Sequence, residues 1–102
     1  MANFTPFYIP SRAEGKTWRV HYHKPQGRLG YVAAYEGELN ADGIYTTVFG
    51  GPNAGRNLRV NLPGRATLRA VTDAGRELLR QLADSGCISA DAVQQFIPRL
   101  VK

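Results

Sequence analysis

The chain has 102 residues, a length typical of one domain with a modest hydrophobic core. Its single cysteine, Cys87, excludes an intrachain disulfide and favours a reducing compartment. The sequence shows neither a signal-peptide pattern nor an apolar run of membrane-spanning length. We therefore expect a cytoplasmic protein without a membrane partner.

Basic residues outnumber acidic residues by thirteen to eight, which gives a formal net charge of +5. Ten of the basic residues are arginines. A guanidinium group binds phosphate through two parallel hydrogen bonds and also stacks on aromatic rings. A polyanionic partner, above all a nucleic acid, is therefore the first hypothesis.

Five β-strands are predicted in the first part of the chain. Stretches rich in β-branched and aromatic residues are separated there by clusters of Gly, Pro, Asn and Asp. The predicted strands cover residues 4–9, 16–24, 28–36, 44–49 and 57–62. Because the connections are short and rich in residues that favour turns, we expect the strands to follow one another as an antiparallel meander.

A long helix is predicted over residues 66–85, because apolar side chains recur there with the helical period. The apolar stripe comprises Leu68, Val71, Thr72, Gly75, Leu78, Leu79, Leu82 and Ala83. An alternative treats Pro63-Gly64 as a hairpin turn and begins a shorter helix at Thr72, but a type II turn does not match the twist of paired strands. Gly75 costs about 1 kcal/mol relative to Ala inside a helix, so we expect the helix backbone to pack closely on the sheet there.

A second, short helix is predicted after Ser89 and Asp91, and Gly86 is expected to end the long helix. The buried side of the short helix would comprise Val93, Phe96, Ile97 and Leu100, and Pro98 should bend or shorten it. Together these elements predict an α+β fold in one domain, residues 1–102. A four- to five-stranded antiparallel sheet from residues 1–62 would carry, on one face, the long helix and the short C-terminal helix from residues 63–102.

The stretch TWRVHYHK, residues 17–24, alternates apolar and polar side chains, so Trp18 and Tyr22 point to one face of a strand and His21 and His23 to the other. Two histidines on one face resemble half of a metal site, but the sequence offers no third histidine and no carboxylate or thiolate at a suitable spacing. It also lacks a nucleophile signature and a pair of carboxylates within a strand. We therefore expect no catalytic residue, no metal site and no cofactor.

Residues 50–57 form a Gly-rich segment that lacks the Gly-Lys-Ser/Thr ending of a phosphate-binding loop and precedes a predicted strand. We interpret it as a long hairpin loop, in which Arg56 is placed to contact a bound strand of nucleic acid or a protein partner. A basic row on the long helix comprises Arg65, Arg69, Arg76 and Arg80. Asp73 and Glu77 are expected to neutralise part of this row at helical spacing.

The sheet face opposite the helices carries the strongest functional signal, because arginines and aromatic residues gather in the predicted strands. Nine of the ten aromatic residues lie within residues 4–49. We predict a nucleic-acid-binding surface that comprises Arg19, His21, His23, Lys24, Arg28, Tyr31, Tyr35, Arg56 and Arg59. Its basic groups would neutralise phosphates while its tyrosines stack on unpaired bases, which favours single-stranded DNA or RNA.

The alternative function belongs to a different class. A small adaptor or inhibitor would bind a protein partner through the exposed aromatic strands or the Gly-rich loop. Homodimerisation through the sheet is compatible with both functions.

Overall fold

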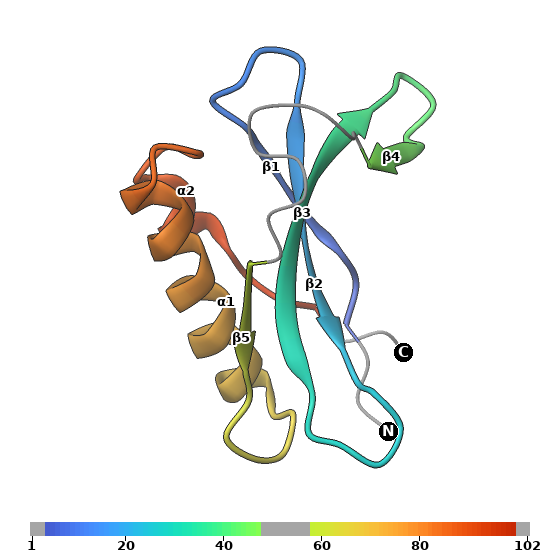
Figure 1. The fold of residues 1–102 in the computed structure, drawn as a ribbon, viewed down its shortest axis with the longest axis vertical. Coiled ribbons are helices and arrows are strands. Elements are labelled where there is room, and N and C mark those ends of the chain that lie inside the picture. Colours follow the sequence, from blue (N-terminus) through green and yellow to red (C-terminus); the bar gives the residue numbers. More distant parts are fainter. Residues whose placement is uncertain (1–3, 48–57, 100–102) are drawn as a thin grey trace.

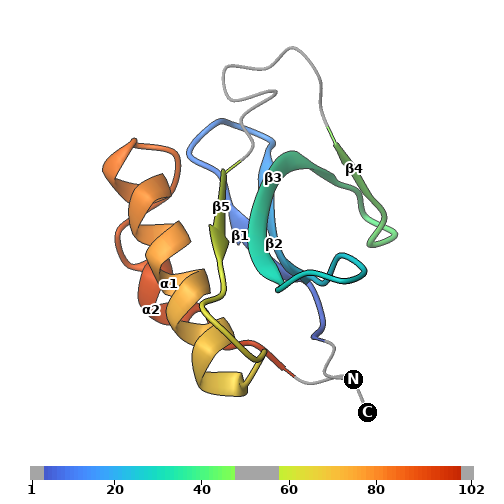
Figure 2. The same cartoon turned by 60° about the horizontal axis from the view of Figure 1, so that its bottom comes forward.

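The computed structural model describes residues 4–47 and 58–99, which contain five strands and two helices (Figure 1). The strands are β1 (Phe7–Pro10), β2 (Thr17–His23), β3 (Tyr31–Leu39), β4 (Tyr45–Thr47) and β5 (Leu58–Asn61), and the helices are α1 (Leu68–Asp84) and α2 (Ala92–Gln95). Both helices lie on the same side of the sheet (Figure 2). The predicted α+β class, with an antiparallel sheet, one long helix and one short helix, is confirmed.

The sheet is built around β3. β1, β2, β3 and β4 pair in chain order and antiparallel, as a meander requires. β5 departs from the expected order, because it pairs with β3 rather than with β4 and places Val60 opposite Val32. β3 has nine residues, whereas β4 has three and β5 has four. Both short strands therefore fit along the same edge of β3, one after the other.

β1 and β3 each begin three residues later than predicted. The strand expected over residues 28–36 is β3, which begins at Tyr31 because the preceding residues form a turn. In this turn the Arg28 N–H donates to the Pro25 carbonyl oxygen at 3.3 Å, and Lys24 Nζ donates to the Arg28 carbonyl oxygen. The strand expected over residues 4–9 is β1, which begins at Phe7, after a proline that cannot donate to a ladder.

α1 confirms the prediction of one long helix. It begins after Thr67, whose Oγ1 accepts a hydrogen bond from the Ala70 N–H at 3.1 Å. The alternative start at Thr72 is wrong, because this residue lies inside the helix and its hydroxyl donates to the Leu68 carbonyl oxygen at 2.7 Å. The helix ends before Gly86, which adopts a positive φ of 76°. Within residues 4–47 and 58–99, no helix combines the length and the apolar composition needed to cross a membrane.

The core lies between the sheet and α1. The predicted core face of the sheet is confirmed, since Trp18, Val20 and Tyr22 are all buried. The helix contributes Val71, Ala74, Leu78, Leu79 and Leu82 to the same cluster. Leu68 was expected on the buried stripe but is 51% exposed. It is the first residue of α1, and because helical side chains lean toward the N-terminus, it projects past the end of the packed surface.

α2 is shorter than predicted and buries a smaller side. Val93 and Phe96 are buried as expected, whereas Ile97 is 61% exposed and Leu100 lies outside the described residues. The chain is already extended at Phe96, with φ of −69° and ψ of 113°. Because a residue before proline avoids the helical region, Ile97 cannot continue the helix toward Pro98. The exposed position of Ile97 follows from this early end.

Gly75 packs closely on a neighbour, but that neighbour is not the sheet. A Cβ at this position would collide with the ring of Phe96, which follows α2. The glycine therefore lets the C-terminal segment lie against the middle of α1.

This contact predicts whether a Gly75→Ala substitution raises or lowers the free energy of unfolding. Alanine favours the helix by about 1 kcal/mol over glycine, but overpacking a core costs about 1–3 kcal/mol. We expect Gly75→Ala to lower the free energy of unfolding measured in urea. In a Phe96→Val background, which removes the ring, the same substitution should be neutral or stabilising. A similar loss in both backgrounds would contradict this packing.

Candidate functional site

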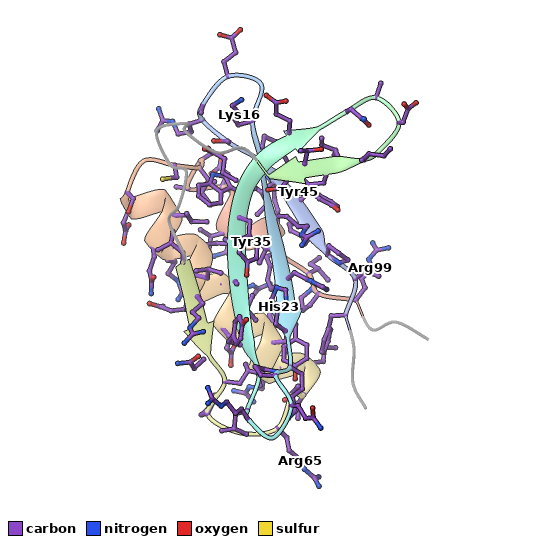
Figure 3. All side chains as sticks on the ribbon, turned by 45° about the vertical axis from the view of Figure 1, so that its right-hand side comes forward. Lys16, His23, Tyr35, Tyr45, Arg65 and Arg99 are labelled. Carbon is purple, nitrogen blue, oxygen red and sulfur yellow. The ribbon has the colours of Figure 1, made fainter. Side chains whose placement is uncertain are left out.

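The sheet face opposite the helices, here called the open face, carries planar and basic side chains from all five strands. Strand alternation and the pairing register assign to it Tyr8, Arg19, His21, His23, Tyr31, Tyr35, Tyr45 and Arg59. Figure 3 shows His23, Tyr35 and Tyr45 in a row along the sheet, with Lys16 near one end and Arg65 near the other. The predicted grouping of Arg19, both histidines, both tyrosines and Arg59 on one face is thus present in the structure.

Tyr31 lies at the centre of a three-layer stack. The ring of His23, from β2, lies nearly parallel to it, with 5.3 Å between the centroids and 26° between the planes. From β5, on the other edge of β3, the Arg59 Cζ lies 4.9 Å from the centroid of the same ring. Both neighbours hold Tyr31 in place, and Arg59 is oriented with its guanidinium group against a ring.

A second arginine stacks on a tyrosine at the other end of the open face. The Arg19 Cζ lies 5.3 Å from the centroid of the Tyr45 ring, and Tyr8 packs against the same ring at 5.8 Å. The Tyr45 hydroxyl donates to the Tyr35 carbonyl oxygen at 2.5 Å. Burial raises the pKa of Tyr45 to about 12, although Arg19 opposes this shift. The hydroxyl therefore keeps its proton at neutral pH.

The two histidines form a pair beside these stacks. Their ring centroids are 4.8 Å apart, and His23 also meets Tyr35 at 5.9 Å with perpendicular planes. Burial lowers the pKa of His21, assisted by Arg19 and opposed by a hydrogen bond to the backbone of Phe4. Burial likewise lowers the pKa of His23, with further contributions from His21 and Arg19. Both rings are therefore neutral near pH 7.

Three nitrogens of the open face are buried and lack a hydrogen-bond partner among the described residues. They are Arg19 Nε, His21 Nδ1 and His23 Nε2. Buried polar atoms are normally hydrogen-bonded, so the partners of these atoms lie beyond the described residues. Trp18 Nε1 in the core and Arg76 Nε on α1 are also buried without a partner among the described residues. An acceptor oxygen of a ligand can bind the Arg19 Nε–H, whereas the nitrogen of a neutral imidazole that carries no proton accepts a hydrogen bond from a donor.

The open face has no acidic side chain among the described residues that the register assigns to it. Glu36 and Glu38 belong to the opposite face of β3, where Ser11 Oγ donates to Glu36 at 2.7 Å and Lys16 Nζ lies 2.6 Å from Glu38. The register therefore assigns no carboxylate of the described residues to the open face, although Glu36 is near enough to contribute to the raised pKa of Tyr45.

The remaining predicted site residues lie away from this cluster or cannot be placed. Lys24 and Arg28 are exposed in the turn between β2 and β3, where they contact each other. Arg56 lies outside the described residues. On α1 two of the expected ion pairs are present: Arg69 Nε lies 3.9 Å from Asp73, and Arg80 lies 2.7 Å from Glu77. The pair expected between Asp73 and Arg76 does not form among the described residues, and Arg76 Nε is buried without a hydrogen-bond partner there.

Tyr8 and Tyr45 belong to the open face but were not among the predicted site residues. Both come from short strands whose register depends on pairing with β2 and β3, so local alternation alone did not assign their faces. In the part of the chain that the structure describes, no three His, Cys, Asp or Glu side chains converge as metal ligands do.

Comparison of the chain with protein-family models, curated proteins and solved structures finds no match.

The histidine pair predicts how folding stability depends on pH. Because the pKa of each ring is lower in the folded chain than in the unfolded chain, the unfolded chain binds more protons below about pH 6.5. The free energy of unfolding, measured in urea, should therefore fall between about pH 7.5 and pH 5.5. The double variant His21→Gln/His23→Gln should show a smaller fall. If the double variant loses as much stability over this pH range as the wild type, groups other than the two histidines cause the loss.

Proposed function

We propose that this protein binds single-stranded DNA or RNA on its open face, in the cytoplasm and without catalysing a reaction. One observation carries the proposal. Two arginines, Arg19 and Arg59, each stack on a tyrosine of a sheet face to which no carboxylate belongs among the described residues. Both arginines share this face with Tyr35, whose ring no parallel ring of the described residues covers, so positive charge and a planar ring are offered to the same ligand.

The stacks prepare the arginines for phosphate. A guanidinium group resting on a ring keeps its N–H donors at its rim, where two of them can bind one phosphate group. Because Tyr31 and Tyr45 already orient Arg59 and Arg19, less side-chain entropy is lost on binding than for a free arginine. The same face then has two fixed cationic positions, from β2 and from β5.

An unpaired strand suits this face better than a duplex. In a duplex the bases expose only their edges, within the grooves. Aromatic side chains of a sheet bind the faces of bases, and these are accessible only when the bases are unstacked. The Tyr35 ring therefore favours single-stranded DNA or RNA.

The proposal predicts binding that weakens steeply with salt and depends on the open-face arginines. Arg59→Ala should weaken binding of a single-stranded oligonucleotide about fivefold and reduce the slope of log affinity against log salt by about 0.7. Arg69→Ala removes the same charge from α1, where the side chain is 93% exposed, and should have little effect. Fluorescence anisotropy at several salt concentrations measures both quantities.

Equal effects of the two arginine variants would mean that net charge alone drives binding, and would contradict a site on the open face. No binding to an oligonucleotide at low salt would overturn the proposed function.

A second candidate function is supported by the outer edge of β5, along which no other strand of the described residues pairs. Leu62 and Gly30 form a hydrogen-bonded pair, with 2.9 Å from the Leu62 nitrogen to the Gly30 oxygen. By the alternation of an antiparallel ladder, the backbone N–H and C=O groups of Arg59 and Asn61 point away from β3. Beside this edge a groove of about 410 Å³ runs along α1, with Val60, Ala70 and Ala74 in its lining. An extended segment of a protein partner, or β5 of a second copy, can add to such an edge.

Self-association at this edge is tested by measuring the molecular mass of the protein in solution. If a second copy adds to β5, light scattering should show the mass doubling as the concentration rises. Ala70→Arg places a charge in the groove and should restore the monomer. A monomer mass at all concentrations would exclude a second copy as the partner and leave only a different protein for this candidate.

A further inference from the structure

A pocket of about 330 Å³ opens on the open face. Its lining residues are Tyr31, Ala33, Tyr35, Leu58 and Arg59. The two tyrosines stand two residues before and two residues after Ala33 on the same face of β3, so the small alanine lies between two large rings. The pocket volume is near the lower end of the range of about 300–1,000 Å³ seen for small-molecule sites.

The two tyrosines of the pocket differ in what they offer to a ligand. Tyr31 lies between His23 and Arg59, one on each side along the sheet. Tyr35 meets only the perpendicular ring of His23, so no ring of the described residues lies parallel to it. A flat ligand can therefore stack on Tyr35 without displacing a parallel neighbour.

Arg59 forms the wall of the pocket toward the edge of the sheet. It is paired with Ala33 as a non-hydrogen-bonded pair, the geometry in which side chains on neighbouring strands are closest. Arg59 is exposed, and its guanidinium group rests on the Tyr31 ring, so the N–H groups at the rim of the guanidinium can donate hydrogen bonds to a ligand. The pocket thus combines an aromatic wall, an apolar floor and a cationic donor.

We propose that this pocket is a subsite for one unpaired nucleobase. The base lies above Ala33 and stacks on Tyr35, while Arg59 donates to an oxygen of the base or of the adjacent phosphate. This inference rests on the proposed function and sharpens it: the protein binds single strands through an inserted base as well as through the backbone.

The test compares two oligomers with the same number of phosphates. One is a thymidine homopolymer, and the other is an abasic strand of the same length. If a base enters the pocket, the wild-type protein should bind the thymidine strand at least about fivefold more tightly than the abasic strand.

Two variants test whether the preference for the thymidine strand arises in the pocket. Ala33→Leu fills the pocket and Tyr35→Leu removes the stacking ring without a change of charge. Either should bring the ratio of the two affinities close to one. Ala41→Leu makes the same side-chain change in the exposed turn between β3 and β4 and should keep the ratio of the wild type. Tyr35→Leu keeps the test decisive if Ala33→Leu fails to fold.

The outcomes distinguish a failure of the base subsite from a failure of the proposed function. Salt-dependent binding with equal affinity for both oligomers would overturn the subsite and leave the proposed function in place. A base preference that survives both pocket variants would also overturn the subsite, since the base would then bind elsewhere. No binding of either oligomer would overturn the subsite together with the function on which it rests.

Discussion

The pairing of β2 with β3 is the constraint on which the rest of the sheet depends. β3 holds β2 along one edge and β5, then β4, along the other, so its register decides which side chains share a face. A slip of one residue would turn Tyr31 and Tyr35 toward α1 and bring apolar residues to the open face. The core prevents this, because Val20 and Val32 must stay buried against the helix. At Gly37 the close approach of β4 has the same effect, since a Cβ there would collide with the Thr46 carbonyl oxygen.

The open face shows features that stability alone does not explain. An unsatisfied buried polar group costs about 1–3 kcal/mol, and this face holds three unpartnered nitrogens among the described residues. Burial also keeps His21 and His23 neutral beside Arg19, which concentrates the positive charge on the arginines. A bound phosphate strand would supply an acceptor for the Arg19 Nε–H and negative charge for both arginines. The unpartnered Arg19 Nε is thus an unfavourable feature of the free protein that a polyanionic ligand would relieve.

Local patterns in the sequence were enough to predict the elements and the faces of the central strands. The alternation around Trp18 and the helical stripe around Leu79 each follow from a short-range period, and both are buried as expected. The partner of β5 was not predictable in this way, because pairing between distant segments leaves no local period. The same reason kept Tyr45 out of the predicted site. The exposed Ile97 was a different case: the helical period placed it inward, but the proline that follows it ended the helix first.

The most direct test of the central claim is an NMR titration of the isotope-labelled protein with a single-stranded oligonucleotide. If the strand binds on the open face, the largest chemical-shift changes should fall on the backbone amides of β2, β3 and β5 and on the side-chain Nε resonances of Arg19 and Arg59. The exposed side of α1, including Arg69, should change little. Shifts that cluster along α1 and the groove beside β5, or no shifts at all at low salt, would contradict binding on the open face.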